Sequence, residues 1–300
     1  PTCGLILLLA CGRVMLSLSP AAAAQQWHSG DGCRWTELSP SASGRAGFTR
    51  QAPSTTGIAF TNVILEDRHL TNQIILNGSG VTCGDVDADG WCDVYLGSID
   101  GPNKLFRNLG GWKFQDITEA AGVACAGLDT ASVALTDVDG DGDLDLIVSS
   151  VGGGTQVFFN DGRGRFTELP QPAPLNPGLG AASMALADID GDGDLDLYVA
   201  NYRTVTLRDQ PNTRFNFRIV DGKAVVSSIN GRPLTDPDLT NRFVFKVRLG
   251  ERGGTFSPEE QGEADVLLRN DGQGRFTPVP WSGGTFLDAE EHPLTRPPFD

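Results

Sequence analysis

The chain has 300 residues, of which 38 are Gly and 18 are Pro, and its formal net charge at pH 7 is −15. A chain this acidic is not expected to bind nucleic acid, because phosphate binding depends on clustered Lys and Arg that release counterions. The abundance of turn residues, without any long helix-like apolar stripe, favours an all-β fold of many short strands.

The first residues are typical of an export signal. An apolar run from Leu5 to Ala10 is followed, after Arg13, by a second apolar stretch, and Ala21 to Ala24 offer the small residues of a signal peptidase site. We therefore predict a signal peptide at 1–24, a linker at 25–46, and a secreted, periplasmic or cell-surface protein. The alternative is a lipid anchor at Cys11, because the residues around it resemble a lipobox. No later stretch reaches the roughly 18 apolar residues of a membrane span.

The next feature is a repeat. Aspartate-rich loops begin at Asp85, Asp137 and Asp188, 52 and 51 residues apart, which is the period of a propeller blade. In each unit the loop lies between two apolar runs, and a third strand, a tight turn and a fourth strand follow. In the second unit these segments are Ser132–Thr136, Asp137–Asp145, Leu146–Ser150, Thr155–Asn160, Asp161–Gly164 and Arg165–Leu169.

The repeat predicts a β-propeller of four-stranded blades over 47–300. The segment from Gly47 to Ile58 parallels the one from Lys113 to Val123 and is predicted to contain the outer strand of a preceding blade. Three loops are fewer than the about four to eight blades of a closed propeller, so we expect an incomplete ring. An aromatic residue follows each tight turn and is expected to pack between adjacent sheets rather than to bind a ligand. These residues are Phe114, Phe166 and Phe276.

Each loop spaces its acidic residues as a calcium site requires. Positions one, three, five and nine of the first loop are Asp, and position six is Gly. Ca²⁺ takes about six to eight oxygens, and alternate residues of a tight turn can aim carboxylates at one point, while position seven offers its main-chain carbonyl. We expect about three Ca²⁺ ions with a structural role. The predicted ligands are Asp85, Asp87, Asp89, Trp91 and Asp93; Asp137, Asp139, Asp141, Asp143 and Asp145; and Asp188, Asp190, Asp192, Asp194 and Asp196.

Other interpretations of the loops are weaker. An EF-hand needs a Glu at position twelve and flanking helices, whereas Leu96, Val148 and Val199 stand at this position within predicted strands. Asp-rich turns can simply bond their own backbone. However, 14 of the 38 acidic residues fall inside the three loops, and that density of charge needs a counter-ion. Mg²⁺ is disfavoured because it prefers a rigid octahedron and retains its waters.

Four cysteines follow the predicted signal, and an even number in an exported protein permits disulfides. The pairing of Cys33, Cys83, Cys92 and Cys125 stays open among three combinations. Cys83 and Cys92 stand where the later repeats have Leu, so a role as small buried hydrophobes is the alternative.

The loops, together with the Phe-Arg-Asn at 106–108 and the segment 114–122, resemble FG-GAP repeats. These repeats are familiar from integrin α-subunit propellers, and the texture of 105–122 is closer to the VCBS-like and cartilage acidic protein branch, which is associated with ASPIC/UnbV domains. The resemblance implies a calcium-stabilised extracellular propeller that acts in adhesion or binding, with no established catalytic residues.

The third unit departs from the repeat by an insertion. Asp145 and Phe159 are 14 residues apart, whereas the matching Asp196 and Arg269 are 73 apart, so about 59 residues are inserted near 202–263. Alternating apolar residues in 214–220, followed by a type I′ turn at Asp-Gly 221–222 into 223–229, predict a hairpin subdomain. Because strands alternate in direction, we expect it at the end of the blade opposite the aspartate loop.

The insertion holds ten Lys or Arg against eight Asp or Glu, in an otherwise acidic chain. We expect it to offer a cationic patch to an acidic glycan or an acidic extracellular protein; a solvated decoration of the rim is the alternative. The candidate ligand-binding residues are Arg203, Arg208, Arg214 and Arg218.

Catalytic signals are sparse. His28, His69 and His292 have no metal-ligand spacing, and the nucleophile-elbow, His-Glu-x-x-His and P-loop patterns are absent. We therefore expect a binding, adhesion or scaffold module and no enzyme. One alternative is a polysaccharide lyase or hydrolase, whose acidic pair need only meet in space, and another is a passive cell-surface element.

Overall fold

The computed structural model describes residues 27–30, 33–36, 47–70, 72–221, 223–250 and 253–280. The chain divides into two units, 1–50 and 51–300. In the first unit, β1 (Trp27–Gly30) and β2 (Cys33–Thr36) form a hairpin in which the rings of His28 and Trp35 stack 4.4 Å apart. This hairpin stands where the sequence predicts a linker. The predicted signal peptide at 1–24, Cys11 and His292 lie outside the described residues. No helix in the described ranges is both long and apolar enough to cross a membrane.

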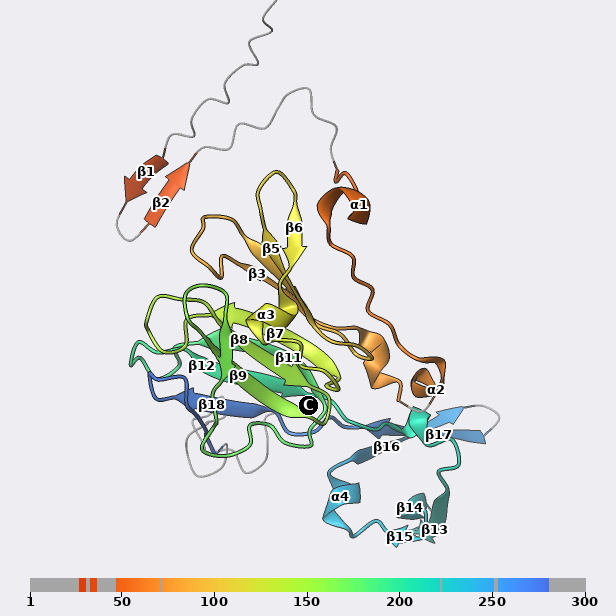
Figure 1. The fold of residues 1–300 in the computed structure, drawn as a ribbon. Coiled ribbons are helices and arrows are strands. Elements are labelled where there is room, and N and C mark those ends of the chain that lie inside the picture. The colour runs from red at the N-terminus through yellow and green to blue at the C-terminus, as the bar shows by residue number, and fades with distance from the viewer. Residues whose placement is uncertain are drawn as a thin grey trace, which may run out of the picture. The chain divides into compact units, whose positions relative to one another are not determined.

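The second unit contains three four-stranded antiparallel sheets, here called blades 1, 2 and 3 (Figure 1). In each blade the aspartate loop joins the first strand to the second, and strands pair in chain order. The four strands that the sequence predicts for the second repeat, which is blade 2, are confirmed to within two residues. Blade 1 is β3 (Val81–Gly84), β4 (Asp93–Leu96), β5 (Lys104–Asn108) and β6 (Phe114–Asp116); blade 2 is β7 (Thr130–Thr136), β8 (Asp145–Ser150), β9 (Gly154–Asn160) and β10 (Phe166–Glu168); blade 3 is β11 (Ala181–Ala187), β12 (Asp196–Asn201), β18 (Val266–Asn270) and β19 (Phe276–Pro278).

The blades pack face to face, and the core lies between them. Every residue of β8 is buried, because Leu146 and Val148 pack in the cluster shared with blade 1 and Ile147 packs in the cluster shared with blade 3. The predicted packing of the repeated Phe is confirmed for Phe166 and Phe276, which lie in these two clusters. The described residues thus form blades of the propeller type and no closed ring.

A segment before blade 1 packs on blade 1. The segment that connects blade 1 to blade 2 packs on blade 2 in the same way. The helices α1 (Pro53–Thr56) and α3 (Thr118–Ala121) both end at a left-handed glycine, Gly57 and Gly122. A Cβ added to Gly57 would lie 2.4 Å from the Phe114 carbonyl oxygen, and one on Gly122 would lie 3.2 Å from that of Phe166. The strand expected within 47–58 is a wrong prediction, since Phe48 is fully exposed and these residues have no strand partner.

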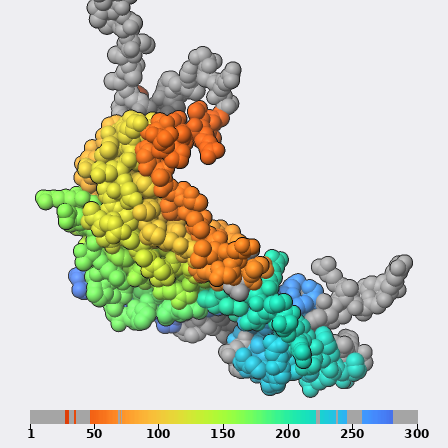
Figure 2. Space-filling model, turned by 45° about the vertical axis from the view of Figure 1, so that its right-hand side comes forward, coloured from red at the N-terminus to blue at the C-terminus, as the bar shows by residue number. Residues whose placement is uncertain are grey.

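The rest of this segment runs along blade 1 to the insertion (Figure 2, residues 51–80 in orange). It contains α2 (Glu66–His69) and the 3₁₀ helix η1 (Ile74–Asn77). Arg68 forms ion pairs with Asp100 of blade 1 and with Asp129, which precedes β7, so one guanidinium joins the ends of two blades. Further along, the Gln73 N–H donates to Asp209 of the insertion at 2.7 Å.

The insertion has a small core of its own, made by Val226, Ile229, Leu239 and Phe243. The predicted turn lies at Asp221, which has a φ of 50°. Since β12 runs away from the aspartate loop, the insertion leaves blade 3 at the opposite end, as strand alternation predicts. Its elements are η2 (Leu207–Asp209), β13 (Phe215–Val220), β14 (Lys223–Ile229), β15 (Arg232–Pro233), α4 (Pro237–Thr240), β16 (Phe243–Gly250) and β17 (Gly253–Glu260).

Candidate metal centre

The three loops bring carboxylates together at the same three positions. In each loop, oxygens of the Asp at positions one, three and nine all lie within 4.8 Å of one another. Hard cations such as Ca²⁺ are bound by oxygen clusters of this kind. The three clusters are Asp85, Asp87 and Asp93; Asp137, Asp139 and Asp145; and Asp188, Asp190 and Asp196.

The carboxylate at position one shapes the loop. Asp137 accepts hydrogen bonds from the N–H groups of Gly140 at 2.8 Å and of Gly142 at 3.0 Å, one on each oxygen. Gly142, at position six, has a φ of 93°, a conformation that other residues adopt only with strain. Asp188 repeats these contacts with its own two glycines. The glycine at position six therefore lets the chain fold back onto the first carboxylate.

The carboxylate at position nine ties the loop to the third strand. Asp145 is fully buried, and its two oxygens accept from the N–H groups of Val138 at 3.1 Å and Asn160 at 2.9 Å. Asp93 and Asp196 make the matching pairs of bonds. Burial raises the pKa of Asp145 to about 6, and the charges of the neighbouring loop carboxylates add to this rise. Burial also raises the pKa of Asp93.

Position five stands outside the three clusters. The predicted ligands Asp89, Asp141 and Asp192 each accept a bond from the N–H two residues later, at 2.9, 2.9 and 3.0 Å. This is the local turn that short acidic side chains commonly form. In this structure the position-five carboxylates therefore brace the loop beside the cluster.

The side chain at position seven lies over the turn between the third and fourth strands. A Cβ added to Gly162 would be 2.4 Å from Asp143 Oδ2, and one added to Gly272 would be equally close to Asp194 Oδ2. In blade 1 the ring of Trp91 covers Gly110 in the same manner. The carboxylates of Asp143 and Asp194 lie outside the three clusters, and the main-chain carbonyl and these side chains stay predicted ligands at position seven.

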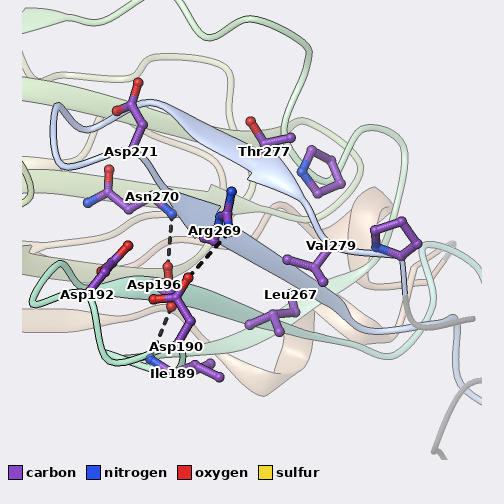
Figure 3. Close-up of a pocket in the computed structure, with 12 residues that line it drawn as sticks. Ile189, Asp190, Asp192, Asp196, Leu267, Arg269, Asn270, Asp271, Thr277 and Val279 are labelled. Carbon is purple, nitrogen blue, oxygen red and sulfur yellow. Dashed lines mark hydrogen bonds and ion pairs between the residues drawn. The ribbon is translucent and has the colours of Figure 1, made fainter. Parts of the chain in front are cut away.

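Two arginines that the sequence analysis did not single out stand beside the clusters. Arg107 Nε lies 2.5 Å from Asp87 Oδ2, and Arg107 Nη2 lies 3.0 Å from Asp89 Oδ2. In blade 3, Arg269 Nη1 lies 3.5 Å from Asp190 Oδ2 (Figure 3). Both arginines precede the Asn that ends the third strand, and this shared place in the repeat was the signal available in the sequence.

One oxygen of the first cluster has no protein partner. The Asp87 side chain is 9% exposed, and its Oδ1 is buried without a hydrogen bond in the described part of the chain. A buried carboxylate oxygen without a partner is costly. Burial raises the pKa of Asp87, although Arg107 opposes that rise. The residues therefore fit a bound cation at this oxygen.

The Asn that ends the third strand of blades 2 and 3 joins each of these blades to the preceding one, a role that sequence reasoning missed. Asn160 Nδ2 donates to the carbonyl of Val86 at 2.8 Å, and Asn270 Nδ2 donates to that of Val138 at 2.8 Å. Val86 and Val138 are position two of the loop in the preceding blade, and both are buried. Loops 1 and 2 are thus each held by the blade that follows.

Among the residues that the structure describes, none covers this same face of blade 3 as a following blade does in blades 1 and 2. Ile189, at position two of the third loop, is 54% exposed, whereas Val86 is 1% exposed. It borders a hollow of about 760 Å³ whose lining includes Leu267, Arg269 and Asn270 (Figure 3). The equivalent surface of blades 1 and 2 is covered by the next blade. The outer face of blade 3 is therefore a site on which a further blade of this type would fit.

The four predicted cationic residues of the insertion differ in their surroundings. Arg203 is 13% exposed; its Nε donates to the Gln261 carbonyl at 2.5 Å, and Glu260 and Glu263 lie about 4 Å away. Its charge is therefore balanced at the base of the insertion. The remaining three, Arg208, Arg214 and Arg218, are exposed.

The cysteines of blade 1 are free in the structure. Cys83 and Cys92 are exposed and Cys125 is half-buried, while the side chain of Cys33 lies outside the description. The alternative role of Cys83 and Cys92 as buried hydrophobes is wrong. Their counterparts Leu135 and Leu144 pack against Gly84 of the preceding blade, and no described blade precedes blade 1.

Comparison with known proteins agrees with the repeat. A family described as FG-GAP-like repeat matches residues 85–148 and 137–199. Cartilage acidic protein 1 is 30% identical over 98 residues in Mus musculus, over 98 in Homo sapiens and over 95 in Xenopus tropicalis. These matches cover 31–32% of this chain and 15% of the length of each relative.

Proposed function

Because the chain is an FG-GAP repeat protein, we propose that its three aspartate loops bind Ca²⁺ and that its blades form part of an extracellular binding or scaffold module. The observation that carries the proposal is the convergence of three carboxylates within 4.8 Å in every loop. In the first loop the unpartnered Asp87 Oδ1 adds independent support.

The chemistry of the loops favours calcium over other ions. The clustered donors are all carboxylate oxygens, the loops contain no imidazole, and the one thiol, Cys92 of loop 1, is not part of its cluster, so nothing in the clusters selects zinc. Ca²⁺ accepts variable geometry at about 2.3–2.6 Å, which suits a loop made of side-chain and main-chain oxygens. The ion would neutralise the clustered carboxylates and hold the hairpin of the first two strands in place. Its role is structural, since the protein itself would fill most of the coordination sphere.

The binding role rests on the architecture and the relatives. FG-GAP repeats in the chain and its similarity to cartilage acidic protein 1 support a repeat module that works outside the cell. We propose that a signal peptide at 1–24 directs its export. We propose that further blades complete the ring on the open face around Ile189. Extracellular proteins or glycans are the proposed partners, and the exposed Arg208, Arg214 and Arg218 of the insertion are the cationic residues available to them.

Calorimetry on the metal-stripped chain tests the calcium proposal. Titration with Ca²⁺ should show about three sites, and at a concentration 100-fold above Kd each site should stabilise the fold by about 2.7 kcal/mol. Asp137→Asn with Asp139→Asn should remove one site, whereas Glu119→Gln, an exposed acid outside the loops, should leave all three. No heat of binding, together with a Tm unchanged by EDTA, would refute the proposal.

A further inference from the structure

The three blades differ at the residue that precedes the Asn ending the third strand. This residue is Arg107 in blade 1, Phe159 in blade 2 and Arg269 in blade 3. It lies on the strand face that carries Leu105, Val157 or Leu267, which is the face turned toward the next blade in the first two cases. Loops 1 and 3 are thus accompanied by Arg and loop 2 by Phe at the same place.

Two of these side chains are counter-ions built into the protein. Arg107 contacts the carboxylates of positions three and five, and Arg269 contacts that of position three. Phe159 instead packs against the apolar core shared with blade 3. Within the described residues, loop 2 makes no ion pair with a Lys or Arg. Arg163 and Arg165 are exposed. Lys113 and Arg275 occupy the place of Arg165 in the other blades, so a basic residue at the place of Arg165 is common to all three blades and does not distinguish their loops.

The charge that faces an incoming ion follows from these contacts. Loop 1 has four Asp and one arginine, a net −3; loop 3 has five Asp and one arginine, a net −4; and loop 2 has five Asp and no arginine, a net −5. We propose that the residue before this Asn, together with the Trp or Asp at position seven, grades the affinity of the loops for a divalent ion, with loop 2 the tightest and loop 1 the weakest. This inference rests on the proposed function.

The arginine acts on the ion through its charge and does not block the site. Arg107 is paired with Asp87 Oδ2 and leaves Oδ1, the oxygen without a partner, free for a ligand. A positive charge fixed this close repels a divalent ion, and it also stabilises the empty loop by neutralising part of its carboxylate charge. Both effects lower the affinity. The arginine also orients one carboxylate, but a single side chain has only a modest conformational entropy to lose.

Terbium luminescence tests loop 1 separately. Trp91 stands at position seven of loop 1, where loops 2 and 3 have Asp, so Tb³⁺ in loop 1 is excited through its indole. Trp91→Phe identifies the share of the emission that arises from this loop. Arg107→Met should tighten Tb³⁺ binding at loop 1 by about tenfold, and Ca²⁺ competition should shift equally. Arg107→Lys, which retains the charge, should stay near the wild-type affinity.

The reverse change tests loop 2. Phe159→Arg should weaken the tightest calcium site seen by calorimetry, while Phe159→Met, which adds no charge, should not. Because Phe159 packs in the core, the circular dichroism and Tm of both variants show whether they are folded. Unchanged or weaker binding in Arg107→Met would overturn the inference, even if the wild type binds about three ions. A wild type that binds neither Tb³⁺ nor Ca²⁺ would instead refute the proposed function itself.

Discussion

Replacing Asn160 with Ala removes three hydrogen bonds, one of which crosses the boundary between blades 1 and 2. Its Nδ2 donates to the carbonyls of Val86 at 2.8 Å and Leu144 at 3.1 Å, and its Oδ1 accepts from the N–H of Gly164 at 3.1 Å. Asn160 is 7% exposed, so water cannot replace these partners well. At about 1 kcal/mol for each bond, Asn160→Ala should lower the free energy of unfolding by about 3 kcal/mol.

Urea unfolding and differential scanning calorimetry in excess Ca²⁺ measure this loss. For a chain of this size the Tm should fall by about 6–12 °C. Asn108 is the matched control, because it is half-buried and bonds only within blade 1, to the Cys92 carbonyl and the Gly110 N–H. Asn108→Ala should cost about 1 kcal/mol, since water can take over its partners. If Asn160→Ala loses no more stability than Asn108→Ala, the bond between the blades does not stabilise their packing.

Two further predictions concern pH and the connection before blade 1. In calcium-free protein the pKa of Asp145 is raised to about 6, above its ordinary value of 3.8, so its charge opposes folding at pH 7. The free energy of unfolding should therefore rise by about 2–3 kcal/mol as the pH falls from 7 toward 4. Asp145→Asn should flatten this rise. A free energy of unfolding that falls over this pH range would contradict the prediction. Arg68→Met removes the bidentate bond to Asp129 and should lower the free energy of unfolding by about 1–3 kcal/mol, as measured in urea. Arg208→Met, which replaces an exposed arginine, should leave the free energy of unfolding unchanged.

Much of the blade structure could be predicted because its signals are local. The interval of 52 and 51 residues and the alternation around each loop locate the strands, and β8 and β9 begin within one residue of the predicted segments. The spacing of Asp and Gly likewise predicts the turn, since the left-handed Gly142 is a property of the loop alone. A strand, in contrast, also needs a partner. The segment at 47–58 has the residues of the repeat without a paired neighbour, and no strand forms there.

The site was only partly predictable, because spacing does not show where a side chain points. Positions three and five are both Asp, yet Asp139 joins the cluster and Asp141 bonds the N–H two residues later. Arg107 and Asn160 were missed for a different reason. Their roles depend on the register of the third strand against the loop and on the blade that packs against it, and a single repeat read in isolation contains neither.

The bond from Asn160 to the Val86 carbonyl gives the blade stack a direction. Its donor belongs to the later blade, and its acceptor belongs to the loop of the earlier blade, beside the carboxylates that would surround an ion. In such a stack, as in a linear repeat array, the stability of each blade depends on its contacts with the adjacent blades. Disordering the first loop takes away an acceptor from the blade that follows, so the loss spreads toward the C terminus. Limited proteolysis after chelation should accordingly produce ordered, successive cuts instead of simultaneous nicking of all three hairpins.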